Sequence, residues 1–207
     1  EDLVEWQIRV ANNETLPKTQ SQLVMQGHSF EARIYAEDPN NDFLPATGIL
    51  QLLKTPITNA KVRIDTGVEQ GDEVSIYYDP MIAKLVVWDE TREKALARLE
   101  TCLQHYAIGG VKTNIDYLRR IAGSAPFKQA QLTTDFIERH NDSISKATNV
   151  DVDTYLPVIT LGYLLSEQKS SEDDLKNTDW NTHDSYRSNL VHKESIELVV
   201  NDKPHTI

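Results

Sequence analysis

A row of charged and polar side chains along one predicted strand is the first place in this sequence where chemistry could occur. From residue 28 to residue 37, alternate positions include Glu31, Arg33, Tyr35 and Glu37. Side chains two residues apart in a strand lie on one face, about 7 Å from each other. A guanidinium flanked by carboxylates can be held in one orientation, with its fork free for a planar oxygen ligand. The residues alone favour a simpler interpretation, a solvent-exposed face with cross-strand ion pairs.

A second candidate is the segment in which Asp79 precedes the apolar residues 81–88 and their single lysine, Lys84. A lysine within a strand that is apolar on both faces is unfavourable unless its charge is paired. By proximity in sequence, Asp79, Asp89 and Glu90 are its candidate partners. The favoured interpretation is structural, with Lys84 at the rim of the strand or in an ion pair.

Other residue types that perform chemistry show no pattern of a site. The six histidines have no metal-ligand spacing, so no metal site is predicted. The single cysteine, Cys102, lies among apolar residues at helical spacing, which is typical of a small buried hydrophobe rather than a reactive thiol. Gly109 and Gly110 lack the lysine and the Ser or Thr of a phosphate-binding loop.

Composition excludes several classes of partner. The chain has 207 residues and a net charge of −11, so nucleic acid, which requires a basic surface, is not an expected partner. There is no polybasic patch and no run of about 20 apolar residues, so no membrane association is expected. A single cysteine forms no intrachain disulfide and fits a reducing compartment. Since the chain begins at Glu1 rather than Met, we expect it to be a piece of a longer protein.

Periodicity predicts an α+β fold for the first 140 residues. In residues 28–36 the side chains of even-numbered residues form a core face opposite the polar row. Residues 81–88, apolar on both faces, indicate a central strand. Further strands are expected at residues 49–54 and 61–65. Helices, three of them with a capping residue at the start, are predicted at residues 2–12, 91–106, 114–122 and 134–140. Grouped helices after clustered strands favour an antiparallel sheet with helices on one side.

The pattern changes after residue 140. Residues 141–153 are rich in Ser, Asn and Asp, and we interpret them as a linker. An apolar helix is predicted at residues 155–168, a polar stretch at residues 169–185 and a strand at residues 195–200. A turn at residues 201–204 then leads into a further strand, so the second domain is expected to be truncated.

Several segments together resemble the last third of biotin carboxylase, the ATP-grasp ligase that carboxylates biotin. They occur in the order found in that family, at residues 27–39 (GHSFEARIYAEDP), 43–48 (FLPATG), 77–85 (YYDPMIAKL), 110–114 (GVKTN) and 136–140 (FIERH). Residues after Tyr155 resemble the start of the linker domain in the biotin-containing subunit of acyl-CoA carboxylases acting on methylcrotonyl-, propionyl- or geranyl-CoA. That likeness depends on a helix followed by Trp180, Tyr186 and Arg187.

The resemblance implies four parts along the chain. They are the end of the ATP-grasp region as a helix (1–20), the biotin carboxylase C-terminal domain (21–140), a linker (141–153) and the start of the linker domain between biotin carboxylase and carboxyltransferase (154–207).

The resemblance also implies roles for five residues. Arg33 matches the arginine that reaches the ureido ring of biotin, and it is the predicted catalytic residue. Glu31 and Asp79 match positions close to that site and would orient it. Thr134 falls in the segment near the adenine ring. Arg63 matches a position at the subunit contact of homodimeric bacterial biotin carboxylases.

Cofactors and partners follow from the same resemblance. Biotin would be attached to a carrier domain outside this chain, and ATP and Mg²⁺ would be bound mainly by residues outside it. Bicarbonate would be the parent's substrate, and a carboxyltransferase β subunit would be a partner in an oligomer. The expected location is the bacterial cytoplasm or, in a eukaryote, the mitochondrial matrix. The chain alone is expected to be inactive.

Two other functions are compatible with parts of the pattern. One is a noncatalytic module that uses the polar strand face and the second-domain helix only to bind partner subunits. The other is a different ATP-grasp ligase, such as a carbamoyl-phosphate or purine enzyme. Residues 77–85 disfavour this last possibility, because they fit biotin carboxylases better.

Overall fold

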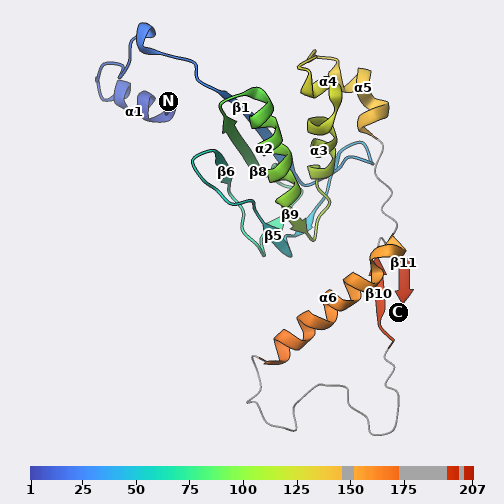
Figure 1. The fold of residues 1–207 in the computed structure, drawn as a ribbon. Coiled ribbons are helices and arrows are strands. Elements are labelled where there is room, and N and C mark those ends of the chain that lie inside the picture. Colours follow the sequence, from blue (N-terminus) through green and yellow to red (C-terminus); the bar gives the residue numbers. More distant parts are fainter. Residues whose placement is uncertain (146–151, 173–194, 201–202) are drawn as a thin grey trace. The chain divides into compact units, whose positions relative to one another are not determined.

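The computed structural model describes residues 1–145, 152–172, 195–200 and 203–207 (Figure 1). The backbone divides into two compact units, residues 1–147 and 148–207. Trp180, Tyr186, Arg187 and most of the predicted polar stretch lie outside the described residues.

The first unit is built around a three-stranded antiparallel sheet. Its order is β1 (His28–Tyr35), β8 (Met81–Asp89) and β6 (Val62–Thr66), so β8 is the central strand, as predicted (Figure 1). The predicted alternation along β1 is confirmed, because Ala32 and Ile34 are buried whereas Glu31 and Arg33 are exposed. One face of the sheet therefore belongs to the core and the other carries the polar row.

Helices cover the core face of this sheet. α2 (Arg92–His105) packs on β1 and β8, and the side chain of Thr91 caps it by accepting a hydrogen bond from the Lys94 N–H. Its buried stripe consists of Ala95, Leu96, Leu99, Cys102 and Leu103. α3 (Ile115–Gly123) packs beside α2 (Figure 1). This arrangement confirms the predicted α+β fold with an antiparallel sheet.

The single strand predicted at residues 49–54 is wrong. The structure has two short strands there, β4 (Gly48–Ile49) and β5 (Leu52–Lys54), which pair with β7 (Glu73–Val74) and β9 (Ala107–Gly109). The chain changes partner where Gly110 passes close to it. A Cβ on Gly110 would lie 2.0 Å from the Ile49 carbonyl oxygen, and its φ is +102°. This glycine is therefore required by close packing.

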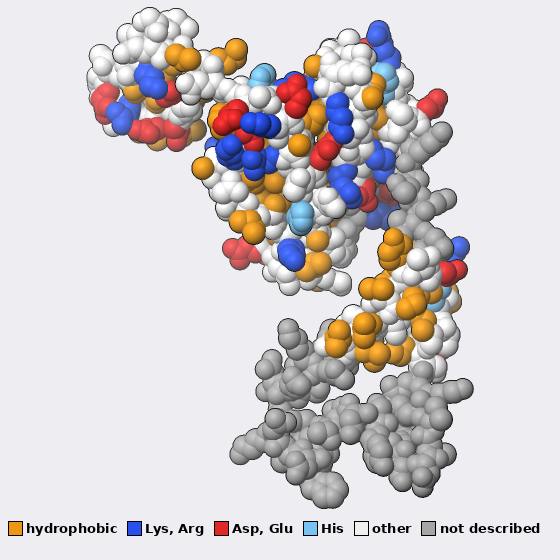
Figure 2. Space-filling model, viewed as in Figure 1, with side chains coloured by type: hydrophobic (Ala, Val, Ile, Leu, Met, Phe, Trp, Pro, Cys, Tyr) orange, Lys and Arg blue, Asp and Glu red, His pale blue; other side chains and the backbone are white. Residues whose placement is uncertain are grey.

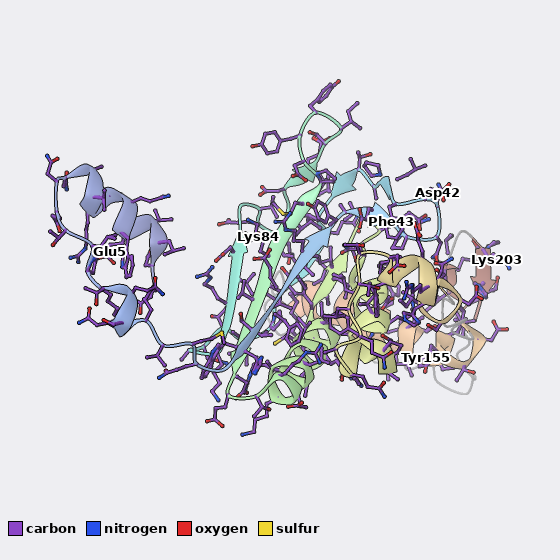
Figure 3. The ribbon with its side chains drawn as sticks, turned by 90° about the horizontal axis from the view of Figure 1, so that it is seen from above. Glu5, Asp42, Phe43, Lys84, Tyr155 and Lys203 are labelled. Atoms are coloured by element: carbon purple, nitrogen blue, oxygen red, sulfur yellow. The ribbon has the colours of Figure 1, made fainter. Side chains whose placement is uncertain are left out.

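The loop after β1 is fixed to α3 by an aromatic contact. β2 (Glu37–Asp38) and β3 (Leu44–Pro45) form a tight antiparallel pair. Asp42 and Phe43, adjacent at the tip of this pair in Figure 3, both have left-handed backbone conformations, with φ of 50° and 56°. The Phe43 ring packs edge-on against Tyr117 at a centroid distance of 5.0 Å, which holds the strained turn in place.

Two shorter helices complete the first unit. α4 (Ala125–Lys128) follows α3, and α5 (Phe136–Ile144) extends beyond the end predicted at residue 140. Ile144 is fully buried, and its carbonyl accepts a hydrogen bond from Arg120 Nε at 2.5 Å. Residues 141–144 thus belong to a packed helix.

The chain begins with α1 (Leu3–Ala11), whose Asp2 cap accepts a hydrogen bond from the Glu5 N–H at 2.9 Å. None of its side chains is buried. The 3₁₀ turn Gln20–Gln22 precedes a connector to β1. Among the described residues, no helix is long and apolar enough to cross a membrane.

The second unit contains α6 (Val152–Glu172) and a hairpin of β10 (Glu197–Val200) with β11 (Lys203–Thr206). These elements agree with the helix and strand predicted there. Many apolar side chains lie on the face of α6 that Figure 2 shows. Tyr155, Val158, Leu161 and Leu165 are among the exposed apolar residues of this helix.

A buried carboxylate joins the sheet to α2. Asp89, at the end of β8, is 4% exposed, and it lies 2.9 Å from Lys61 Nζ and 2.6 Å from Arg98 Nη2. Hydrogen bonds from Lys61, then Arg98, hold the pKa of Asp89 well below its usual value. The three charges form a cross-link between β8, α2 and the turn before β6.

Substitution of Gly27 by alanine should destabilise the first unit. Gly27 has a φ of +68°, and a Cβ there would lie 2.5 Å from both the Trp88 ring and the Asp89 carbonyl oxygen. We expect Gly27→Ala to lower the free energy of unfolding by about 2–4 kcal/mol, measured by urea denaturation. Gly67→Ala is the control, because Gly67 faces open space. Equal stability of the two variants would contradict the packing argument.

The Asp89 cross-link predicts an acid-dependent loss of stability. Because the pKa of Asp89 is lower in the folded than in the unfolded chain, its contribution is complete above the ordinary value of 3.8 and is lost as the pH falls further. Between pH 7 and pH 2.5, Asp89→Asn should therefore lose less unfolding free energy than the unsubstituted chain. Asp116→Asn, at an exposed pair with Arg119, should retain the full pH dependence. Identical pH profiles for Asp89→Asn and the unsubstituted chain would refute this role.

Candidate functional site

The polar row of β1 places one oriented guanidinium on an open surface. Arg33 Nε donates to Glu31 Oε1 at 3.2 Å, and the Arg33 side chain is 59% exposed. Hydrogen bonds first with Glu31 and then with Tyr35 raise the pKa of Arg33. Arg33 is therefore a fixed cation with donors left for an oxygen ligand.

The register of the sheet extends this row across three strands. Arg33 lies opposite Lys84 of β8, which lies opposite Asp65 of β6. Residues directly opposite each other in antiparallel strands point to the same face. We define the charged face as the side chains of Glu31, Arg33, Tyr35, Arg63, Asp65 and Lys84. Figure 3 labels Lys84, and Ala83, Leu85 and Val87, which lie on the opposite face of β8, are buried in the core.

The partners predicted for Lys84 from sequence proximity are wrong. Asp89 is bound by Lys61 and Arg98, Glu90 pairs with Lys94 at 2.8 Å, and Asp79 accepts from the Met81 N–H at 2.9 Å. Asp89 is an odd number of residues from Lys84, so the two side chains project from opposite faces of β8. Lys84 instead lies mid-strand and half-buried, beside Arg33 and Asp65.

The other predicted site residues differ in how they relate to Arg33. Asp79 is exposed in the turn before β8, and Thr134 is exposed in the turn before α5. Arg63 lies on the charged face but pairs with Asp65 at 3.0 Å. Of the other four predicted residues, Glu31 is the one that forms a hydrogen bond with Arg33 within the part of the chain that the structure describes. The roles assigned to these residues remain predictions.

A residue that sequence reasoning did not include in the site contacts the backbone at Arg33. Asn114 was expected to cap α3, but its side chain makes no cap hydrogen bond and bonds the main chain of β1 instead. The helix predicted to begin at Thr134 begins at Phe136 in the structure, and its N-cap residue, Asp135, makes no cap hydrogen bond with its side chain. Burial raises the pKa of Glu37, and a hydrogen bond with Asn114 opposes that rise. The sequence signal for including Asn114 in the site was its position in GVKTN, one of the segments that resemble biotin carboxylase.

A metal site is not evident in the part of the chain that the structure describes. It contains no group of three or more His, Cys, Asp or Glu side chains arranged to hold a metal ion. The charged face instead presents cations with hydrogen-bond donors. Such an arrangement fits a planar or anionic oxygen ligand.

Comparison with known protein families identifies the class to which this fold and face belong. The model of the biotin carboxylase C-terminal domain matches residues 31–139, just over half of the chain. The chain therefore belongs to the biotin carboxylase C-terminal domain family. This confirms the resemblance seen in the sequence.

Two curated relatives of this chain are subunits of methylcrotonoyl-CoA carboxylase. The chain is 47% identical over 201 residues to the mitochondrial methylcrotonoyl-CoA carboxylase subunit alpha of Dictyostelium discoideum, covering 96% of this chain and 28% of that protein. It is 52% identical over 149 residues to the subunit of the same name from Oryza sativa subsp. japonica, covering 72% of this chain and 20% of that protein. The chain thus spans less than a third of the length of these curated relatives.

Solved structures agree with the fold. The biotin carboxylase domain of Hydrogenobacter thermophilus 2-oxoglutarate carboxylase, in complex with MgADP, ADP and bicarbonate, is similar with a TM-score of 0.68 and 36% identity. The match covers 72% of this chain and 32% of that chain. The biotin carboxylase subunit of pyruvate carboxylase gives the same TM-score and identity.

Proposed function

We propose that this chain forms one wall of the biotin site in the biotin carboxylase component of an acyl-CoA carboxylase of the methylcrotonoyl-CoA type. The observation that carries the proposal is the guanidinium of Arg33, held 3.2 Å from Glu31 on an open sheet face, in a member of this family. Relatives that bear the methylcrotonoyl-CoA carboxylase name support the subtype.

The positive charge of Arg33 suits biotin carboxylation, in which negative charge develops on biotin. It stabilises the negative charge that develops on the ureido oxygen when the neighbouring nitrogen is deprotonated. Glu31 fixes the guanidinium before the reaction, so little reorganisation is needed as charge develops. Asp79, whose carboxylate accepts a hydrogen bond from the Met81 N–H in the turn before β8, is proposed to orient the same site.

The remaining components come from outside this chain. ATP and Mg²⁺ supply the phosphoryl chemistry that activates bicarbonate, and we assign their binding mainly to residues outside the chain, with Thr134 near the adenine ring. Biotin is delivered on a carrier domain, and a carboxyltransferase β subunit is the downstream partner. Arg63 is assigned to a subunit contact in the resulting oligomer. The location is the mitochondrial matrix in a eukaryote, or the cytoplasm in a bacterium.

The isolated 207-residue chain should not carboxylate biotin, since one wall of a site holds neither the nucleotide nor bicarbonate. The test is ATP cleavage that depends on bicarbonate and free biotin, with the complete carboxylase subunit as positive control. Turnover by the isolated chain would show that the missing parts are not required.

Removal of the Arg33 guanidinium should impair the complete carboxylase subunit. We expect Arg33→Ala to lower kcat for carboxylation of free biotin by about 10²–10³-fold, as for other charge-stabilising donors. The rate of carboxybiotin formation is the measurement. Arg119→Ala is the matched control, because it removes an exposed arginine of α3 that pairs with Asp116 on its own helix. A near-normal rate for Arg33→Ala would reject its role and favour a noncatalytic binding module.

A further inference from the structure

The main chain that carries Arg33 is held by a buried residue from a distant part of the sequence. Asn114 is 5% exposed. Its Oδ1 accepts from the Tyr35 N–H at 3.0 Å, and its Nδ2 donates to the Arg33 carbonyl at 3.1 Å. Its own N–H donates to the Tyr35 carbonyl at 3.2 Å. Three hydrogen bonds thus fix the two residues on either side of Ile34.

The hydrogen bonds from Asn114 reach β1 at a point where the strand has few partners within its own sheet. β1 is an edge strand of the β1-β8-β6 sheet, so one side of it has no strand partner within that sheet. On the other side, Ile34 pairs with Ala83 but Tyr35 pairs with Met81, so the ladder is interrupted next to Arg33. A bulge of this kind bends and twists the strand. Asn114 supplies the free edge with partners at the same point.

The orientation of the Asn114 amide leaves little freedom. An amide oxygen accepts and an amide nitrogen donates, so only one orientation satisfies both the Tyr35 N–H and the Arg33 carbonyl. An asparagine at this position of a helix ordinarily stabilises the helix by capping it, and Asn114 does not. Its side chain is thus committed to β1 rather than to its own helix.

We propose that Asn114 is a positioning residue that aims Arg33 by fixing the main chain from which the guanidinium projects. This inference rests on the proposed function of Arg33. Glu31 restrains the far end of the side chain, and Asn114 restrains its origin. A reacting group displaced by about 1 Å can lose about 10²-fold in rate, so the restraint at the origin matters.

The test is a double-mutant cycle in the complete carboxylase subunit, with carboxylation of free biotin as the measured reaction. Asn114→Ala is expected to lower kcat by about 10–100-fold, while KM for ATP stays within about twofold of its original value. In an Arg33→Ala background the same substitution should change kcat by less than about threefold, because no guanidinium remains to be positioned.

A matched control separates positioning from stability. Arg120→Ala removes a tertiary hydrogen bond from the same helix to the Ile144 carbonyl, on the side of α5. It should keep kcat within about threefold, and thermal unfolding should show both single variants folded at the assay temperature. If Asn114→Ala does not fold, Asn114→Asp replaces it in the cycle, since it keeps the acceptor for Tyr35 and loses the donor to Arg33.

The outcomes distinguish the positioning role of Asn114 from the proposed function of Arg33. Losses that simply add in the double variant, or a normal kcat for Asn114→Ala, would overturn the positioning role while leaving Arg33 in place. A normal kcat for Arg33→Ala would instead overturn the proposed function itself.

Discussion

The antiparallel register between β1 and β8 is the constraint on which the rest of this structure depends. With Arg33 opposite Lys84, Ser29, Glu31 and Arg33 are exposed on one face of β1, whereas Ala32 and Ile34 are buried on the other. A slip of one residue would exchange the two sets. Arg33 would then be buried among apolar side chains and Ile34 would be exposed. The core and the charged face are therefore two consequences of one pairing.

Both ends of this pairing are fixed by interactions that tolerate little change. At the start of β1, Gly27 passes so close to Trp88 that a side chain has no room, and the Trp88 indole N–H donates to the Gln26 carbonyl at 3.1 Å. At the end of β8, the carboxylate of Asp89 joins the strand to α2 through Arg98. Backbone packing and a buried charge thus hold the same end of the sheet, and Asn114 holds the other.

Features set by local periodicity were predictable from the sequence. The alternation of β1, the two-sided apolar pattern of β8 and the stripe of α2 each follow from side chains a few residues apart. Features that depend on distant contacts were not. The division of residues 49–54 between two partners results from the approach of Gly110, sixty residues later. The commitment of the Asn114 side chain to β1 depends likewise on tertiary structure.

The candidate site also combines features that the local sequence pattern predicts with features that it does not. An unusual polar row on β1 is visible from residue types alone, yet its proposed ligand came from family resemblance. The structure adds why Glu31 contacts Arg33 and why Lys84 does not meet Asp89: both follow from the period of two along a strand. Asp79 and Thr134 were assigned by motif position only, and no contact in the described residues joins either one to Arg33.

The charged face is less acidic than the chain as a whole. The chain has 21 basic and 32 acidic residues, whereas the polar row of β1 and the charged face together hold three cations (Arg33, Arg63 and Lys84) and three carboxylates (Glu31, Glu37 and Asp65). Adjacent strands lie about 5 Å apart, so the ammonium of Lys84 adds to the positive potential at the Arg33 fork. Glu31 orients Arg33 and Asp65 orients Arg63. The Arg33 donors beside the Lys84 ammonium favour a ligand that becomes negative during the reaction over one that stays neutral.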